Sequence, residues 1–214
     1  MVLTPYDERR ERLLQIAASV FAAKGYHSTT MRGLARVSGM SLAGIYHYFA
    51  GKDEILYLIQ ERCFTRVVEG AAQAVAEGTT TTEKLERFIH HHVTFFAGHM
   101  DEMKVLSHEA ESLSAERIEG VNQLKKSYVG QLLGLLKELD PPLPDDVDPR
   151  VAAYSLFGMM NWIYTWYRPD RDGPVEALTD EMTRLFFGGF RAGVERGGAP
   201  VDGGCEVTSA HGAD

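Results

Sequence analysis

Two short stretches that favour helix, residues 31–37 and 42–49, are separated by a tight turn that contains Gly39. Thr30 and Ser41 each precede one of them, and a hydroxyl side chain in that position caps a helix by accepting a backbone N–H. Two short helices joined by so tight a turn are typical of a helix-turn-helix unit. This spacing constrains the chain more than any other feature in it.

The second stretch, "SLAGIYHYFAGKDEIL", combines small residues with polar-tipped rings. In a helix-turn-helix unit the second helix enters the DNA major groove. Small residues within 41–44 would allow close approach to a duplex, and the Tyr-His-Tyr run at 46–48 offers polar groups to phosphates and flat faces to bases. Ile45 and Phe49, four residues apart, would face inward. Lys52 begins the next helix, where an ammonium and free N–H groups would hold a phosphate.

The rest of the chain predicts helices, because no Val/Ile/Thr/Tyr alternation bounded by turn residues is present. The fold class is therefore all-α. The expected helices cover residues 5–24, 31–37, 42–49, 52–77, a segment beginning in 78–84 and running past Phe96, 100–139 with a break near 112–115, 149–167 and 175–194. Four prolines within 140–149 exclude helix interior there, and 168–174 reads as a turn.

Charge is distributed unevenly. The chain carries a net charge of −8, yet residues 1–60 hold seven Lys/Arg against five Asp/Glu. A basic end on an acidic body suits a terminal domain that faces a polyanion. No apolar run is long enough to cross a bilayer. Cys63 and Cys205 do not form a disulfide framework, so we expect free thiols and a cytoplasmic protein without membrane partners.

The segment "TTMRGLARVSGMSLAGIYHYFAGKDEIL" resembles the DNA-binding domain of the TetR family of bacterial transcriptional regulators, and the likeness extends from about Leu13 to Leu58. The resemblance implies an all-helical homodimer with about nine helices per subunit. It implies a helix-turn-helix DNA-binding domain over 1–52, a ligand-binding and dimerisation domain over 53–196, and a tail over 197–214 that its composition predicts to be disordered.

By this resemblance, operator DNA would contact Thr30, Arg32, Ser41, Ala43, Gly44, Tyr46, His47, Tyr48 and Lys52. Tyr46 and Lys52 are the expected phosphate contacts, while Ala43, Gly44 and His47 are best placed for bases. The run Leu-Ala-Gly at 42–44 departs from a hydrogen-bonding readout and favours methyl contacts and DNA shape. The alternative is that Tyr46 and Tyr48 merely pack on the next helix.

The last two expected helices are apolar enough to form a dimer interface. The segment "VAAYSLFGMMNWIYTWY" is apolar nearly all round, which suits a four-helix bundle formed with a second copy. The interface residues expected from composition and resemblance are Tyr154, Phe157, Leu178, Met182, Leu185, Phe186 and Gly189. A dimer would present two recognition helices to a palindromic site.

Long aromatic helices in the remainder of the chain suit an apolar ligand. The expected lining comprises Phe88, His92, Phe95, Phe96, Leu106, Glu109, Tyr128, Met159, Trp162, Ile163 and Trp166. Ordinary core packing is the alternative for each. The segment "NWIYTWYRPDRDGP" with "EMTRLFFGGF" is similar to a TetR-like subgroup that answers to fatty acyl-CoA. The phosphates of the coenzyme would then meet Lys125, Lys126, Arg168 and Arg171, unless these are simply solvated charges.

The expected function is a repressor that an apolar ligand such as a fatty acyl-CoA releases from its operator, with residues 52–77 as the lever. An efflux or detoxification regulator with an aromatic ligand, and a helical protein-binding adapter, remain alternatives. We expect no enzyme, because catalytic motifs are absent. Three consecutive histidines, residues 90–92, point in three directions on a helix, so we expect no metal site and no cofactor.

Overall fold

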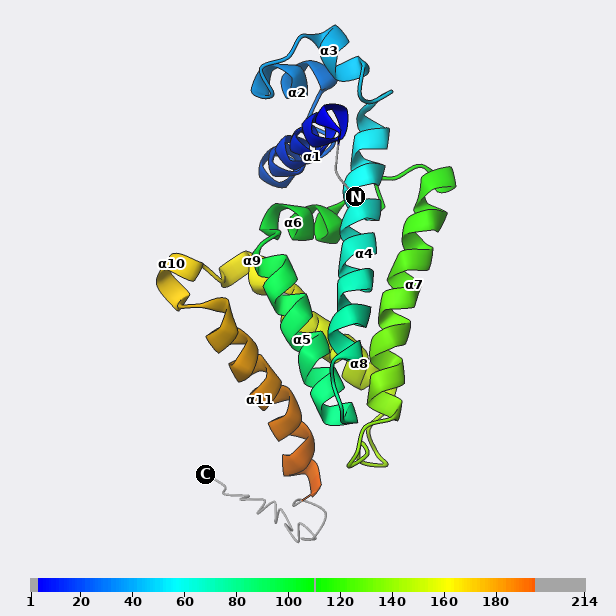
Figure 1. Ribbon diagram of the computed structural model, residues 1–214, viewed down its shortest axis with the longest axis vertical. Coiled ribbons are helices and arrows are strands. Elements are labelled where there is room, and N and C mark those ends of the chain that lie inside the picture. The colour runs from blue at the N-terminus through cyan, green and yellow to red at the C-terminus, as the bar shows by residue number, and fades with distance from the viewer. Residues whose placement is uncertain (1–3, 110, 195–214) are drawn as a thin grey trace, which may run out of the picture.

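The computed structural model describes residues 4–109 and 111–194, and the regular structure in these ranges is helical (Figure 1). The all-α prediction is therefore confirmed. The helices are α1 (Pro5–Lys24), α2 (Met31–Val37), α3 (Leu42–Tyr46), α4 (Lys52–Ala76), α5 (Thr81–Ala97), α6 (Met100–His108), α7 (Ala115–Lys137), α8 (Pro149–Asn161), α9 (Ile163–Trp166), α10 (Pro169–Asp172) and α11 (Val175–Val194). Of these described helices, α9 and α10 have four residues each, which leaves nine longer ones.

Local side-chain caps explain where several helices begin. The Thr30 side chain accepts the N–H of Gly33, and the Ser41 side chain accepts that of Gly44, each at 3.0 Å. Gly39, between the two helices, has φ of 67°, a left-handed conformation that disfavours a side chain. The two predicted short helices and their turn are thus confirmed, although α3 ends at Tyr46 rather than at residue 49.

The first three helices form a head at one end of the molecule, and α4 runs from this head into the body (Figure 1). The core of the head includes residues from α1 to α4 but also Val105 of α6, Leu113 before α7 and Val121 of α7. Packing is therefore continuous across residue 52, where the sequence predicts the domain boundary. The body therefore contacts the head directly through this shared core.

The body core joins α4, α5, α7, α8 and α11. The predicted helix 149–167 is in fact interrupted at Trp162. Its carbonyl accepts both the N–H and the hydroxyl of Thr165, at 3.1 and 2.7 Å, which replaces the α-helical bonding by a tighter turn. The predicted turn 168–174 likewise contains the short helix α10.

The expected helix over 100–139 is divided, because α6 ends at His108 and α7 begins at Ala115, so the break starts slightly before the predicted position. The predicted disordered tail, 197–214, and Cys205 lie outside the described residues. Among the residues that are described, no helix combines the length and the apolar character that a membrane span requires.

Candidate functional site

The outer face of α3 carries the predicted recognition residues. Ile45 and Phe49 are buried in the head core, as their spacing predicts. The opposite side therefore faces outward, and Tyr46 on it is 50% exposed. The other recognition residues of this helix are Ser41, Ala43 and His47, which are exposed, and Gly44 and Tyr48, which are half-buried. The unit thus presents small residues and polar-tipped rings on one surface.

Tyr6 at the start of α1 extends this surface, and the sequence reasoning missed it. Its ring stacks on Tyr48 with centroids 4.9 Å apart and meets His47 edge-on at 5.9 Å. Tyr48 therefore packs on Tyr6 of α1 as well as against the head core. Tyr6 is 44% exposed beside the recognition residues. Its position directly after the Thr-Pro cap of α1 was the only sequence signal available.

Lys52 has a structural role that its position in the sequence does not reveal. Its Nζ donates to the carbonyls of Tyr26 and Thr29, at 2.8 and 2.9 Å, and lies 4.1 Å from the centre of the Tyr26 ring. The ammonium thus ties α4 to the turn after α1. The predicted phosphate contact stays a prediction and would have to share this ammonium with the two carbonyls.

The two residues predicted on α2 lie near its start. Thr30 and Arg32 are both exposed, so they are accessible to DNA beside α3. The Thr30 hydroxyl already caps α2 through Gly33. Its oxygen can still donate its proton to a phosphate, because the cap uses it only as an acceptor.

Glu109 joins the body to the head. One carboxylate oxygen accepts the backbone N–H of Tyr26 at 3.0 Å, and the other accepts the Ser112 hydroxyl at 2.7 Å. That hydroxyl lies 3.2 Å from Nε2 of His27, and the Glu109 carbonyl accepts the Gln60 amide at 2.9 Å. These contacts form a polar latch, defined here as Tyr26, His27, Gln60, Glu109 and Ser112. Both carboxylate oxygens of Glu109 are thus used within the protein, and its predicted role in ligand binding stays a prediction.

Four of the predicted effector residues come together in the body core. Phe88, His92, Phe96 and Tyr128 are all buried, and Ile163 is buried in the same core. Phe88 stacks on Tyr128 with ring centroids 5.0 Å apart, and His92 lies 4.8 Å from Phe96 by the same measure. The arrangement is a packed aromatic cluster between α5 and α7. Its role in ligand binding stays a prediction.

The other predicted effector residues differ in exposure, and of these Phe95 packs edge-on against Phe96 of the cluster, with centroids 5.1 Å apart. Trp162 and Trp166 are 60% and 42% exposed. Phe95 is half-buried and stacks on His99 with centroids 4.3 Å apart. Leu106 is buried in the core, and Met159 is half-buried. The two tryptophans are therefore corrected from cavity lining to surface residues.

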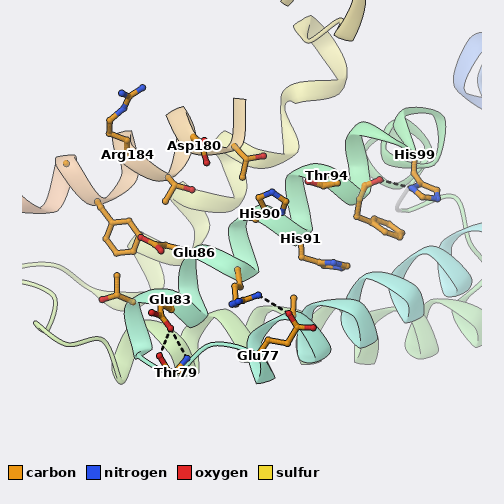
Figure 2. Close-up of a pocket in the computed structure, with 18 residues that line it drawn as sticks. Glu77, Thr79, Glu83, Glu86, His90, His91, Thr94, His99, Asp180 and Arg184 are labelled. Atoms are coloured by element: carbon orange, nitrogen blue, oxygen red, sulfur yellow. Dashed lines mark hydrogen bonds and ion pairs between the residues drawn. The ribbon is translucent and has the colours of Figure 1, made fainter. Parts of the chain in front are cut away.

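A large open cavity of about 1430 Å³ lies between α5 and α11 (Figure 2). Most of the residues that line it carry polar side chains, with Glu86 and His90 on one wall and Asp180 and Arg184 on the other. Of the predicted effector residues, this cavity includes Phe95 alone. It is therefore not the apolar pocket that the sequence predicts.

The three histidines of α5 point to different places. His90 and His91 both border the open cavity, His91 also packs over Gly70 of α4, and His92 is buried. Burial lowers the pKa of His91. Within the described part of the chain, no three His, Cys, Asp or Glu side chains are grouped so that they could hold a metal ion.

The predicted dimer residues divide into exposed and buried sets. Tyr154 and Leu185 are 57% and 67% exposed, and Gly189 is also exposed. Leu178 is half-buried. By contrast, Phe157, Met182 and Phe186 belong to the core of the same chain. They are corrected to core residues, because α8 and α11 each turn one apolar face inward. Val151 and Trp162 instead continue the exposed stripe of α8 through Tyr154, at helical spacing.

The four predicted coenzyme-binding cations do not cluster. Arg171 pairs with Asp172 at 2.8 Å, and Arg168 donates to the carbonyl of Tyr167. Lys125 of α7 lies over the Phe64 ring, with Nζ 5.4 Å from its centre, and Lys126 is exposed. Two of these cations lie near α10 and two on α7, so they form no single phosphate site in this structure.

Family descriptions match most of the chain. Residues 13–57 match "Bacterial regulatory proteins, tetR family", and residues 78–190 match "Tetracyclin repressor-like, C-terminal domain". The chain is 27% identical over 189 residues to the fatty acid metabolism regulator protein of Bacillus subtilis (strain 168), covering 86% of this chain and 97% of that protein. It is 24% identical over 185 residues to the HTH-type transcriptional repressor KstR2 of Rhodococcus jostii (strain RHA1), covering 85% and 91%.

A solved structure shows the same architecture. AibR in complex with isovaleryl coenzyme A and operator DNA superposes with a TM-score of 0.74 at 28% identity, covering 83% of this chain and 97% of AibR. Together with the exposed helix-turn-helix surface, these matches define the class of protein, which is regulatory and not enzymatic. The chain belongs to the TetR family of bacterial regulatory proteins and is a DNA-binding transcriptional regulator.

Proposed function

We propose that this regulator represses transcription as a homodimer on a palindromic operator and that a fatty acyl-CoA or a related apolar thioester releases it. The observation that carries the proposal is similarity over nearly the whole length of a fatty acid metabolism regulator and of an isovaleryl coenzyme A complex. The similarity to KstR2 supports repression rather than activation. Acting on operator DNA, the protein would work in the cytoplasm.

The exposed apolar stripe of α8 supports the homodimer. Val151, Tyr154 and Trp162 are each more than half exposed along one face, and Leu185 of α11 is 67% exposed. A second copy would cover both faces in a four-helix bundle and hold the two recognition helices at a set distance. A symmetric pair of heads reads a palindromic site.

The contacts between body and head give the mechanism a physical route. Tyr164 of α9 bonds with His108 of α6, with Oη and Nε2 3.2 Å apart. The next residue, Glu109, holds the head through the polar latch. A ligand that enters the aromatic cluster under α9 would therefore displace α6 and the latch together. If that displacement changes the spacing of the two heads, the ligand and the operator favour different conformations of the protein. Binding of one then weakens binding of the other.

The first experiment is a gel shift with a DNA fragment from upstream of the protein's own gene. Binding should weaken steeply with salt, because Lys and Arg displace counterions from phosphates. His47→Ala should relax base preference at particular positions, whereas exposed Arg87→Ala, far from the head, serves as the control. Acyl-CoA should release the fragment. Release by no acyl thioester, or tighter binding in its presence, would contradict the proposed ligand response.

The second experiment tests the dimer. Tyr154→Glu places a charge in the apolar stripe and should yield monomers in analytical ultracentrifugation, with loss of operator binding. Glu138→Gln, an exposed change at the end of α7, should remain dimeric. A Tyr154→Glu protein that stays dimeric and binds the operator would show that this face is not the interface.

A further inference from the structure

A polar pair is buried inside the aromatic cluster of the body. His92 of α5 is 1% exposed and Tyr128 of α7 is 4% exposed. Nδ1 of His92 lies 2.9 Å from the Tyr128 hydroxyl, and the two rings are nearly parallel, with an interplanar angle of 10°. Phe96 and Phe157 surround the imidazole with centroids 4.8 and 5.8 Å away. Two polar side chains at such depth need a reason beyond packing.

Within the described residues, the second nitrogen of the imidazole, Nε2, is buried and makes no hydrogen bond shorter than 3.5 Å, although the Asn161 side chain is close enough to interact with the ring. A buried donor without an acceptor costs free energy, so such groups mark a site for water or a ligand more often than a pure packing position. Asn161 lies near this ring at the end of α8, where the helix breaks. The unpartnered nitrogen is thus close to the one interruption in the wall of α8 and α9.

The surroundings of His92 Nε2 favour a ligand group that is uncharged. Burial lowers the pKa of His92 to about 3, against a smaller rise from Asn161, so the ring is neutral at physiological pH. The buried polar residues of the described chain are Thr29, Gln60, His92 and Thr179. None of these is a cation, and an ionised carboxylate in this core would remain unpaired. A neutral carbonyl needs only the single hydrogen bond that Nε2 can donate.

We propose that His92, oriented by Tyr128, donates a hydrogen bond from Nε2 to the neutral thioester carbonyl of an acyl effector, and that this subsite rejects the free fatty acid. The inference rests on the proposed response to apolar thioesters and adds which chemical form is recognised. The proposal assigns the tautomer in which the Tyr128 hydroxyl donates to Nδ1 and the ring proton lies on Nε2. The acyl chain would take the space of the surrounding rings after α9 moves at the Trp162 break.

The test is calorimetric titration of the full chain with matched probes of one acyl chain, chosen from hexanoyl, decanoyl and hexadecanoyl. The probes are the coenzyme A thioester, the N-acetylcysteamine thioester and the free acid. Both thioesters should bind the wild type, and the free acid should bind at least about tenfold more weakly. His92→Phe and Tyr128→Phe should each weaken thioester binding by about tenfold or more, while exposed His90→Phe on the same helix should not.

A spectroscopic measurement on the wild type tests the subsite without depending on whether the variants fold. A thioester labelled with carbon-13 at the carbonyl should show its infrared band shifted to lower frequency when bound, as hydrogen bonding to the oxygen requires. An unshifted band, or equal thioester affinity in wild type and folded His92→Phe, would overturn the subsite while leaving the proposed thioester response intact. If no acyl thioester binds the wild type, the proposed ligand class fails first, and the subsite with it.

Discussion

Removal of the Glu109 side chain tests whether the body holds the head through the polar latch. In Glu109→Ala the backbone N–H of Tyr26 loses its acceptor 83 residues away, while the Glu109 carbonyl remains to accept the Gln60 amide. Tyr26 is 7% exposed, so water reaches its N–H poorly. The Ser112 hydroxyl also loses its carboxylate partner, but it still has His27 beside it.

The magnitude follows from these contacts. A buried donor left without an acceptor costs about 1–3 kcal/mol, and the Ser112 bond adds little because its hydroxyl can turn to another partner. We therefore expect Glu109→Ala to lower the free energy of unfolding by about 2 kcal/mol. Glu109→Gln keeps an acceptor oxygen and should cost about half as much. The matched control is Glu111→Ala, an exposed residue of the same linker, which should change stability by less than about 0.5 kcal/mol.

Urea unfolding at one fixed protein concentration measures the free energy, because the stability of an oligomer depends on concentration. Hydrogen exchange followed by mass spectrometry reports the amide itself. A loss of about 2 kcal/mol corresponds to exchange up to about 30-fold faster in the peptide that contains Tyr26. Equal midpoints for Glu109→Ala and Glu111→Ala, with unchanged exchange at Tyr26, would refute the latch.

Three further predictions concern the body. Gly70→Ala should destabilise the protein by about 1–3 kcal/mol, because a Cβ there would overlap the His91 ring, and His91→Ala in the same chain should restore most of the loss. Burial raises the pKa of Cys63 to about 12. In a Cys205→Ser background, the Cys63 thiol should therefore react with a disulfide reagent at pH 8 only as fast as the protein unfolds. Rapid labelling of the folded protein would disprove this. The pKa of His92 is lowered to about 3, so the unfolded state takes up the proton first as pH falls below about 6.5. Between about pH 6 and 4, the free energy of unfolding of the wild type should therefore fall by about 1.4 kcal/mol per pH unit relative to His92→Phe in urea titrations. If the free energies of the two proteins changed in parallel with pH, the ring would not be held neutral.

Much of the head could be predicted from the sequence, because its determinants are local. Thr30 and Ser41 cap helices through residues three positions away, and Gly39 sets the turn between them. The inward direction of Ile45 and Phe49 follows from helical periodicity. Tyr6 could not be found in this way, because its contact with Tyr48 joins residues far apart in the chain.

The body was harder to predict for the same reason. Apolar residues on α8 and α11 share one composition, and only packing separates buried Phe157 from exposed Tyr154. A helical pattern shows that two faces are apolar but not which of them meets the chain's own core. The expected helix is interrupted at Trp162, and periodicity does not predict such a tightened turn.

By itself, the sequence determined the helical class and the helix-turn-helix unit, since caps, turns and periodicity act within a few residues. The tertiary structure decided that Lys52 and Glu109 tie helices together and that His92 is buried with one nitrogen unpartnered. These fates depend on partners in distant segments, such as Tyr26 for Glu109. Side chains with the same chemistry therefore acquire their roles only when folding brings those segments together.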